Sequence, residues 1–262
     1  MARSSHLTRK ALRTRRDVLL LGLASGQVLV VSCDSSGGVG PKDHDTIRVD
    51  ARKVGRYAAR NALLELCCAG ASAIALTLTL STELKPTGTE IRSGLIKALR
   101  EFGLPNTIPL TMSSEKNFAV DVTGIGVTAL GFTTMKNLRI GLSEPGDAVL
   151  LLGKPAVGEK VLEAERLGWI PTVREIKLLL KSKNVHEILP VGSTGVLHEI
   201  SVLTGDSGLR FEPLSSSSYG RGENWKVSAG PSTAFLLTVD HSNKDRLVKR
   251  LKAPVREIGR LR

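Results

Sequence analysis

The sequence has few aromatic residues, few cysteines and no long apolar run. Aromatic residues make up 3% of its 262 positions, so a core must consist mainly of Leu, Val, Ile and Ala, and base stacking on exposed rings is disfavoured. Three cysteines, Cys33, Cys67 and Cys68, are too few for a disulfide framework or a zinc knuckle, which indicates a reducing, cytoplasmic setting. No apolar stretch approaches the roughly 20 residues that span a bilayer. These absences argue against a membrane protein and against a disulfide-rich secreted one.

Acidic residues are scarce at both ends of the chain, and this accounts for the formal net charge of +12. Residues 1–16 contain six Lys and Arg and no acid, and residues 241–262 contain eight with two acids. Subtracting these from the totals of 37 bases and 25 acids leaves 23 of each in residues 17–240. We interpret the basic ends as solvated, which disfavours nucleic acid as a partner. Nucleic-acid binding through the ends stays open as an alternative.

The first half of the sequence predicts strands interrupted by two amphipathic helices. Apolar runs at 17–23 and 26–33 flank a short turn, which is typical of a hairpin. A helical period predicts a helix over 51–68, a second helix fits 90–102, and the alternation between them predicts a strand over 72–80. This pattern favours an antiparallel or mixed α+β unit.

Two finer expectations concern the faces and ends of these strands. The alternation in 72–80 places Ile74 on the same face as Leu76, Leu78 and Leu80. Apolar residues at alternate positions from Phe118, continuing past a glycine as far as position 132, predict one long strand with a glycine bend.

The segment Ser143-Glu144-Pro145-Gly146 is the clearest break in the chain. We therefore predict an N-terminal domain over 1–145 and a C-terminal domain over 146–262. In the second domain we expect strands over 148–152 and 235–239 and a flexible loop over 215–222. We expect helices over 157–167, 172–182, 194–203 and 244–251. The sequence contains no internal repeat.

Candidate site residues gather first at DSSGGVGPKDHD, residues 34–45. Asp34 follows an apolar strand, and the glycines after it would let backbone N–H groups approach an anion. The spacing is not that of a Walker A loop or of G-x-G-x-x-G. A metal or phosphate site and a charged turn both remain open on this segment alone.

Further carboxylates stand at element boundaries or on apolar faces. Glu65 interrupts the apolar face of the helix over 51–68, where an unpaired charge would cost several kcal/mol, so we expect a cation partner, solvent or an arginine beside it. Glu115 lies in TMSSEKNF, and on this segment alone a surface turn is favoured over a metal ligand. In the second domain, Gly192 and Ser193 could open a helix that binds an anion or is simply capped, and His198 lies on that helix.

Several motifs together resemble one family. DVLLLGLASGQVLVVSCD resembles its opening acid, hairpin and strand-end aspartate, and GGVGPK followed by DHDTIRVD is similar to the synthetase's D-G-V-G-T-K region. ELCCAGASAIAL resembles D-L-x-x-x-G-A-x-P, SSEKNF stands in the place of G-G-D-T, and GDAVLLLGKPAVGEKVL resembles the opening of the second domain. On these motifs the sequence resembles the aminoimidazole ribonucleotide synthetase (PurM-like) superfamily, which includes thiamin-monophosphate kinase.

The resemblance implies a fold and a set of ligands. The fold would be an α+β, two-domain PurM-like fold whose N-terminal mixed sheet pairs in a homodimer and whose C-terminal domain is α/β. ATP would bind between the domains together with Mg²⁺, and the partner would be a small-molecule nucleoside. Phosphoryl transfer depends mainly on positioning and charge neutralisation.

The resemblance also implies roles for individual residues. The implied Mg²⁺ ligands are Asp17, Asp34, Glu65 and Glu115. The implied contacts to ATP are Gly37, Gly38, Gly40, Lys42, Ser113, Ser114 and Asn117. The implied contacts to the acceptor are Ser193, Thr194, Gly230, Ser232 and Thr233. Asp43 or His198 could serve as a general base, which a loose transition state makes optional.

Departures from the family's motifs suggest an altered acceptor. The kinase motif S-D-G-L is replaced by Ser193-Thr194-Gly195-Val196, and Gly230-Pro231-Ser232-Thr233 lacks the acids of G-E-D-Y. Among the branches of the superfamily the sequence is most similar to α-ribazole kinases, which phosphorylate the 5′-hydroxyl of a benzimidazole nucleoside in cobamide salvage. The alternatives are a thiamin-monophosphate kinase, another ATP-dependent relative or a non-catalytic ATP-binding protein.

Overall fold

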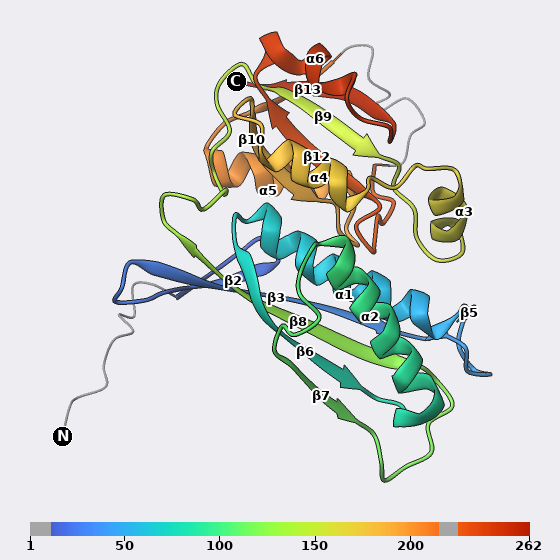
Figure 1. The fold of residues 1–262 in the computed structure, drawn as a ribbon. Helices are drawn as coiled ribbons and strands as arrows, with labels where there is room; N and C mark the ends of the chain where they lie inside the picture. Colours follow the sequence, from blue (N-terminus) through green and yellow to red (C-terminus); the bar gives the residue numbers. More distant parts are fainter. Residues whose placement is uncertain (1–11, 215–224) are drawn as a thin grey trace, which may run out of the picture. The chain divides into compact units, whose positions relative to one another are not determined.

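The computed structural model describes residues 12–214 and 225–262, and its chain divides into two compact units, Met1–Leu138 and Arg139–Arg262. The division falls a few residues before the break at Ser143 that the sequence indicates. Both units combine a β-sheet with helices (Figure 1), so the predicted α+β class is confirmed. The predicted loop at 215–222 lies outside the described residues. Each helix of the described ranges is too short or too polar to cross a membrane.

Unit 1 contains a mixed sheet of six strands. All neighbours pair antiparallel except β6 and β7, which are parallel. The predicted hairpin is formed by β2 and β3, and the connection from β6 to the parallel β7 passes through a helix, as parallel pairing requires. In sheet order the strands are β1 (Leu12–Arg15), β2 (Val18–Gly22), β3 (Gln27–Gly37), β8 (Gly124–Thr134), β6 (Ser72–Leu80) and β7 (Leu110–Ser114).

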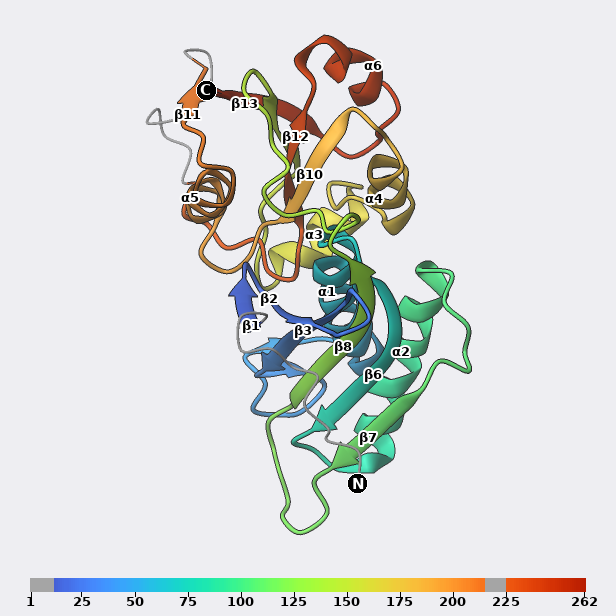
Figure 2. The ribbon, with the colours of Figure 1, turned by 90° about the vertical axis from the view of Figure 1, so that its left-hand side faces the viewer.

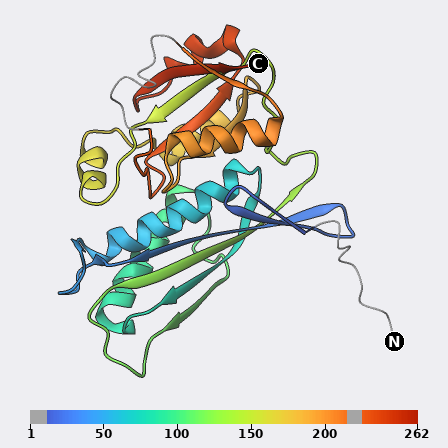
Figure 3. The same ribbon diagram turned by 180° about the vertical axis from the view of Figure 1, so that it is seen from behind.

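Two helices cover one face of this sheet, as Figures 1 and 3 show. Helix α1 (Ala51–Cys68) has the predicted bounds, and its N-cap Asp50 accepts a hydrogen bond from the amide of Arg52. Helix α2 (Thr89–Glu101) follows the short π-helix η2 (Leu84–Gly88). The contact between α1 and α2 is made backbone to backbone, because Gly55 of α1 lies on the carbonyl of Ile91 and Gly94 of α2 lies on that of Arg52.

Three expectations for unit 1 are wrong. Strand β3 does not end before Asp34 but continues to Gly37, because it pairs with β8 along its whole length. Residues 118–122 form a loop and not a strand, and the strand that precedes them, β7, was missed. A register shift between Ala73 and Ala75 turns Ile74 away from its expected face, and its exposed fraction is 40%.

Unit 2 contains a five-stranded sheet in which every pair is antiparallel. The two predicted strands, β9 and β12, are its buried centre, with every residue of both buried. Three strands with weaker apolar patterns were missed: β10, β11 and β13. In sheet order the strands are β10 (Val185–Pro190), β12 (Ala234–Val239), β9 (Ala148–Gly153), β13 (Val255–Leu261) and β11 (Phe211–Pro213).

Helices pack on both faces of this second sheet, with α5 (Val196–Ser207) on one side and α4 (Val173–Leu180) on the other (Figure 2). Alternate residues of β9 point to opposite faces of the sheet. On the face covered by α5, Val149 and Leu151 belong to the same buried hydrophobic cluster as Leu203 of that helix. Helix α4 begins with the capping box of Thr172 and Glu175. Helices α3 (Lys160–Arg166), η3 (His241–Asn243) and α6 (Lys244–Val248) complete the unit.

Replacing Gly55 with alanine should lower the free energy of unfolding by about 2 kcal/mol or more, since a Cβ there would overlap the Ile91 carbonyl, which cannot move freely. Gly205→Ala in α5 is the matched control. Its Cβ would meet no atom within 4 Å, so the better helix propensity of alanine should stabilise by about 0.5 kcal/mol. Urea unfolding of both variants measures the difference, and equal stability of the two would contradict the close helix contact.

Candidate functional site

A tightly folded segment follows β3, and we call residues 37–48 the glycine loop. It contains the short parallel strands β4 (Val39–Gly40) and β5 (Ile47–Arg48). The amide of Gly38 donates to the carbonyl of Thr123, and the amide of Ile47 donates to the carbonyl of Gly38. Hydrogen bonds therefore join the two ends of the loop to each other and join the loop to the residue that precedes β8.

Asp45 fixes this loop from inside. Its exposed fraction is 6%, and its carboxylate accepts hydrogen bonds from the amide of Lys42 (2.9 Å) and from the amide and hydroxyl of Thr123 (both 2.7 Å). A Cβ at Gly40 would lie 2.7 Å from Asp45 Oδ2 and would overlap Thr123 Oγ1. Only glycine fits there, so this glycine serves packing. Asp45 is not among the predicted site residues, because an aspartate inside a polar turn carries no signal that it is buried.

The ammonium group of Lys42 binds two neighbouring segments of unit 1. Its Nζ donates to the carbonyl of Val120 (2.6 Å) and lies 2.7 Å from Glu83 Oε2. Burial of Glu83 opposes its ionisation, but hydrogen bonds from Lys42, Thr82 and Thr87 outweigh this and lower its pKa to about 2. Lys42 is thus paired with a carboxylate that stays ionised at any physiological pH.

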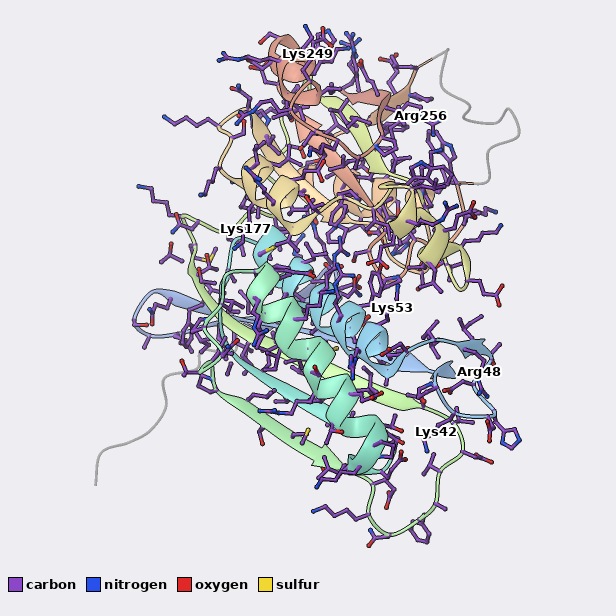
Figure 4. All side chains as sticks on the ribbon, turned by 45° about the vertical axis from the view of Figure 1, so that its right-hand side comes forward. Lys42, Arg48, Lys53, Lys177, Lys249 and Arg256 are labelled. Atoms are coloured by element: carbon purple, nitrogen blue, oxygen red, sulfur yellow. The ribbon has the colours of Figure 1, made fainter. Side chains whose placement is uncertain are left out.

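Other cations surround the same end of unit 1. Figure 4 shows Lys42, Arg48 and Lys53 projecting from the glycine loop and the first turn of α1. Arg48 donates to the carbonyl of Lys42 (2.9 Å) and pairs with Asp43 (3.1 Å), while Arg52 pairs with Glu90 (3.4 Å). Such exposed pairs are weak, so these side chains can exchange partners with an incoming anion at little cost.

Asp34 lies on the helix-covered face of β3, three residues before the glycine loop. Asn61 of α1 donates to its Oδ1 at 2.6 Å, and the neighbouring Ser32 hydroxyl donates to the carbonyl of Ala62 (2.7 Å). Desolvation by burial raises the pKa of Asp34 to about 6, although the Asn61 hydrogen bond works in the opposite direction. A nearby cation would relieve this cost, and so a carboxylate of this kind suits a metal ion or a bound proton.

The other three predicted metal ligands have different surroundings. Asp17 is exposed in the turn between β1 and β2, and Glu65 is buried in α1 with an exposed fraction of 7%. Glu115 follows β7, which is three strands from the strand of Asp34, or about 14 Å across the sheet. Its Oε1 already accepts hydrogen bonds from the amides of residues 116, 117 and 118, which lower its pKa.

Within residues 12–214 and 225–262, no group of three or more His, Cys, Asp or Glu side chains is placed to hold a metal ion. The described residues therefore do not by themselves supply a cage of carboxylates. A Mg²⁺ ion that enters with substrate phosphates needs only one or two carboxylates, and Asp34 has the burial and the raised pKa that fit this role. Ser113, Ser114 and Asn117, predicted to contact ATP, lie at the end of β7 and in the loop after it.

The predicted acceptor contacts of unit 2 fall on two turns. Ser193, Thr194 and His198 are exposed at and beyond the start of α5. The amide of Leu197 there donates to the carbonyl of Trp225 (3.2 Å), and the buried carboxylate of Glu199 accepts the amide of Gly192 (3.2 Å). Helix α5 begins at Val196 with Gly195 as its N-cap, and no described side chain caps it. The Leu197 amide of its first turn is already paired with a carbonyl, so fewer N–H groups remain for the anion site that the sequence left open.

The second turn, residues 229–233, is largely structural. Ser232 is buried with a positive φ of 48°. The hydroxyl of Thr233 accepts the amide of Ala156 (2.9 Å) and lies within hydrogen-bond distance of the carbonyls of Ala156 and Ala229. Gly230 is half-buried and remains the more accessible member of this turn.

The raised pKa of Asp34 predicts a pH-dependent stability. The folded pKa of about 6 exceeds the ordinary value of 3.8, so the folded state holds this proton more tightly than the unfolded chain. Stability is therefore fully present below about pH 4 and falls by up to about 3 kcal/mol as pH rises through 6. In Asp34→Asn this part of the fall should vanish. Urea unfolding at pH 4 and pH 7 tests it against Asp43→Asn, whose carboxylate is exposed; identical pH dependence in both variants would refute the assignment.

Comparisons with known proteins agree with this architecture. Residues 15–128 match the family described as AIR synthase related protein, N-terminal domain. No curated protein sequence matches the chain.

Solved structures match both units at low sequence identity. Thiamine-monophosphate kinase from Stenotrophomonas maltophilia K279a is 17% identical, with 97% of this chain and 89% of that chain covered and a TM-score of 0.59. AaThiL complexed with AMPPCP and TMP is 16% identical over 94% and 84%, with a TM-score of 0.59. Hydrogenase maturation protein HypE in complex with ATP is 16% identical over 89% and 76%, with a TM-score of 0.61. The chain therefore has the fold of these proteins, and residues 15–128 of its N-terminal unit are similar to the AIR synthase related N-terminal domain.

Proposed function

We propose that this protein is an ATP- and Mg²⁺-dependent small-molecule kinase. Two of the similar structures contain AMPPCP or ATP, and the match extends over nearly the whole chain. The observation that carries the proposal is the half-buried Asp34, three residues before a glycine loop that Asp45 fixes and beside which Lys42, Arg48 and Lys53 project. Phosphoryl transfer requires such an arrangement, since most of its catalysis is positioning and neutralisation of charge.

Within this proposal Asp34 would hold the Mg²⁺ that accompanies the triphosphate, and the chemistry that the ion would supply there is neutralisation of phosphoryl charge. Asn61 keeps the Asp34 carboxylate in place through the 2.6 Å hydrogen bond. Asp17 and Glu65 remain candidates for further oxygen contacts. Glu115 is the weakest of the four, because one of its oxygens is occupied by three backbone amides.

Lys42 takes a different role from the one the sequence suggested. Because its ammonium group is shared between Glu83 and the Val120 carbonyl, we propose that it positions the glycine loop and does not hold a phosphate oxygen. Arg48 and Lys53, which project from the same end of unit 1, then supply positive charge toward the phosphates. Asp43 is a poor general base, since it is 92% exposed and paired with Arg48.

For the acceptor we propose the 5′-hydroxyl of α-ribazole, which becomes α-ribazole 5′-phosphate. The support is the sequence resemblance, together with the neutral Thr194 where the kinase motif has an acid. Thiamin monophosphate is the alternative acceptor, favoured by the similarity to thiamine-monophosphate kinases. A relative that binds ATP without this chemistry is the second alternative, since HypE also shares the fold.

Incubation of the protein with ATP, Mg²⁺ and each candidate acceptor should release ADP with α-ribazole and give a product one phosphoryl group heavier by mass spectrometry. Asp34→Asn should lower the rate by about 100-fold or more, whereas the matched Asp43→Asn should retain it. Turnover with thiamin monophosphate alone would reject α-ribazole. ATP binding without ADP release for any acceptor would reject the kinase itself.

We also propose a homodimer formed through the sheet of unit 1. The face of this sheet opposite α1 and α2 is covered by no described element of the unit (Figure 1). A row of apolar residues crosses four strands on this face. Leu19 of β2 lies opposite Val31 of β3, which lies opposite Leu130 of β8, and Leu130 lies opposite Ala75 of β6. A second copy of the same face is a complementary partner for such a surface, because apolar rows of this kind bury well against each other.

Leu19→Lys should convert the dimer into a monomer in sedimentation velocity, because it would bury a charge in the proposed interface. Leu19 is 38% exposed in the chain, so the substitution should not disturb the core. Phe118→Lys, at a loop residue 79% exposed, is the control and should remain dimeric. A wild-type protein that sediments as a monomer at all concentrations would reject the homodimer.

A further inference from the structure

Two segments of unit 2 carry a concentrated positive charge. Residues 174–183 (REIKLLLKSK) contain four Lys and Arg with one acid, and residues 244–252 (KDRLVKRLK) contain five with one acid. The first segment is most of helix α4 and the turn after it, and the second is α6 and the chain that leads toward β13. In the sequence they are far apart, and each alone reads as a solvated charged face.

The fold places the two segments side by side. At one end, the amide of Asp240 donates to the carbonyl of Asn184 (3.0 Å). At the other end, Glu175 of α4 accepts hydrogen bonds from the amides of Lys252 (2.7 Å) and Ala253 (3.0 Å). The chain from 240 to 253 therefore runs along α4, and Figure 2 shows α4 and α6 on the same side of the sheet.

Most carboxylates near these two segments already accept hydrogen bonds or form ion pairs. Glu175 is buried with an exposed fraction of 7%, and its oxygens accept the backbone amides just described. Glu257 pairs with Lys244 and lies 3.6 Å from Arg260. Asp240 accepts hydrogen bonds from Ser242 and Asn243, which lower its pKa.

Seven cations remain on the surface, none of them in an ion pair with a described residue; Figure 4 labels one of them, Lys249. We call this set the basic surface, and it consists of Arg174, Lys181, Lys183, Arg246, Lys249, Arg250 and Lys252. The exposed acid among them is Asp245. A surface with this excess of positive charge attracts polyanions.

We propose that the basic surface of unit 2 binds the phosphate backbone of a nucleic-acid duplex. Neither segment contains an aromatic residue, so stacking on unpaired bases, which single-strand binders use, is absent from it. The exposed large apolar residues of the described chain all lie elsewhere, at positions 19, 74, 112, 118, 135, 142, 157 and 167, so the surface has nothing to insert into a lipid layer. Lys and Arg side chains contact phosphates without reading sequence.

The test is fluorescence anisotropy of labelled DNA and RNA duplexes of about 20 base pairs, titrated with the full chain at several salt concentrations. Binding should fall steeply with salt and should not depend on base sequence. Lys181→Glu/Lys249→Glu should weaken the affinity by about 10-fold or more and reduce the slope of log K against log salt by about 2. The matched control is Arg92→Glu/Lys97→Glu on α2, which changes the net charge equally at exposed positions.

Equal loss in both double variants would assign the binding to net charge and overturn the proposal. Undiminished binding by Lys181→Glu/Lys249→Glu would assign it to another basic segment, such as residues 1–16, and would overturn it as well. Binding to vesicles of anionic phospholipid but to neither duplex would also reject it. Thermal unfolding of each variant verifies that the fold is intact. The outcome is independent of the kinase assay, since no residue of the basic surface is proposed to contact ATP or its acceptor.

Discussion

The packing of α1 against β3 and α2 is the constraint on which the rest of unit 1 depends. The hydrogen bond from Ser32 to the carbonyl of Ala62 and the one from Asn61 to Asp34 join the helix to the strand at neighbouring levels. On its other side, the helix meets α2 through glycines that let the two backbones touch. Because α1 cannot shift, the partly desolvated Asp34 carboxylate stays in the surroundings that raise its pKa.

The glycine loop extends the same principle to a segment without regular structure. A buried carboxylate, Asp45, holds the loop to Thr123, and an ion pair holds Lys42 to Glu83. Such internal hydrogen bonds fix a loop before any ligand arrives, and binding then costs less conformational entropy. The cations that can exchange partners, Arg48 among them, lie on the outside of this rigid frame.

Periodicity predicted the elements whose burial follows a simple pattern. Helix α1 and strand β6 were predicted with their observed bounds, because a long apolar face and a strict alternation leave little choice. Strand β7 was missed, because most of its residues are exposed and its pairing with β6 is set by a distant segment. The end of β3 was misjudged, since polar residues extend a strand when a partner such as β8 continues beside them.

The candidate site was less predictable than the fold. Asp34 stood out because a carboxylate followed an apolar run, but Asp45 and Glu83 carry no local signal. Their roles arise from contacts with Thr123 and Lys42, which lie 78 and 41 positions away in the chain. The resemblance to a family indicated which residue types to examine. It could not indicate that Lys42 would be neutralised by Glu83, since that pairing depends on how two loops meet.

The crossing of α1 and α2 has a consequence for how this sequence can vary. Where two main chains touch, the spacing of the helices is independent of the volume of the side chains around them, so neighbouring surface positions are free to drift. Gly55 and Gly94 cannot change in this way, because any larger residue at either position would push the two helices apart. Two of the smallest residues in the chain thus limit its evolution at this point more strictly than its large apolar ones.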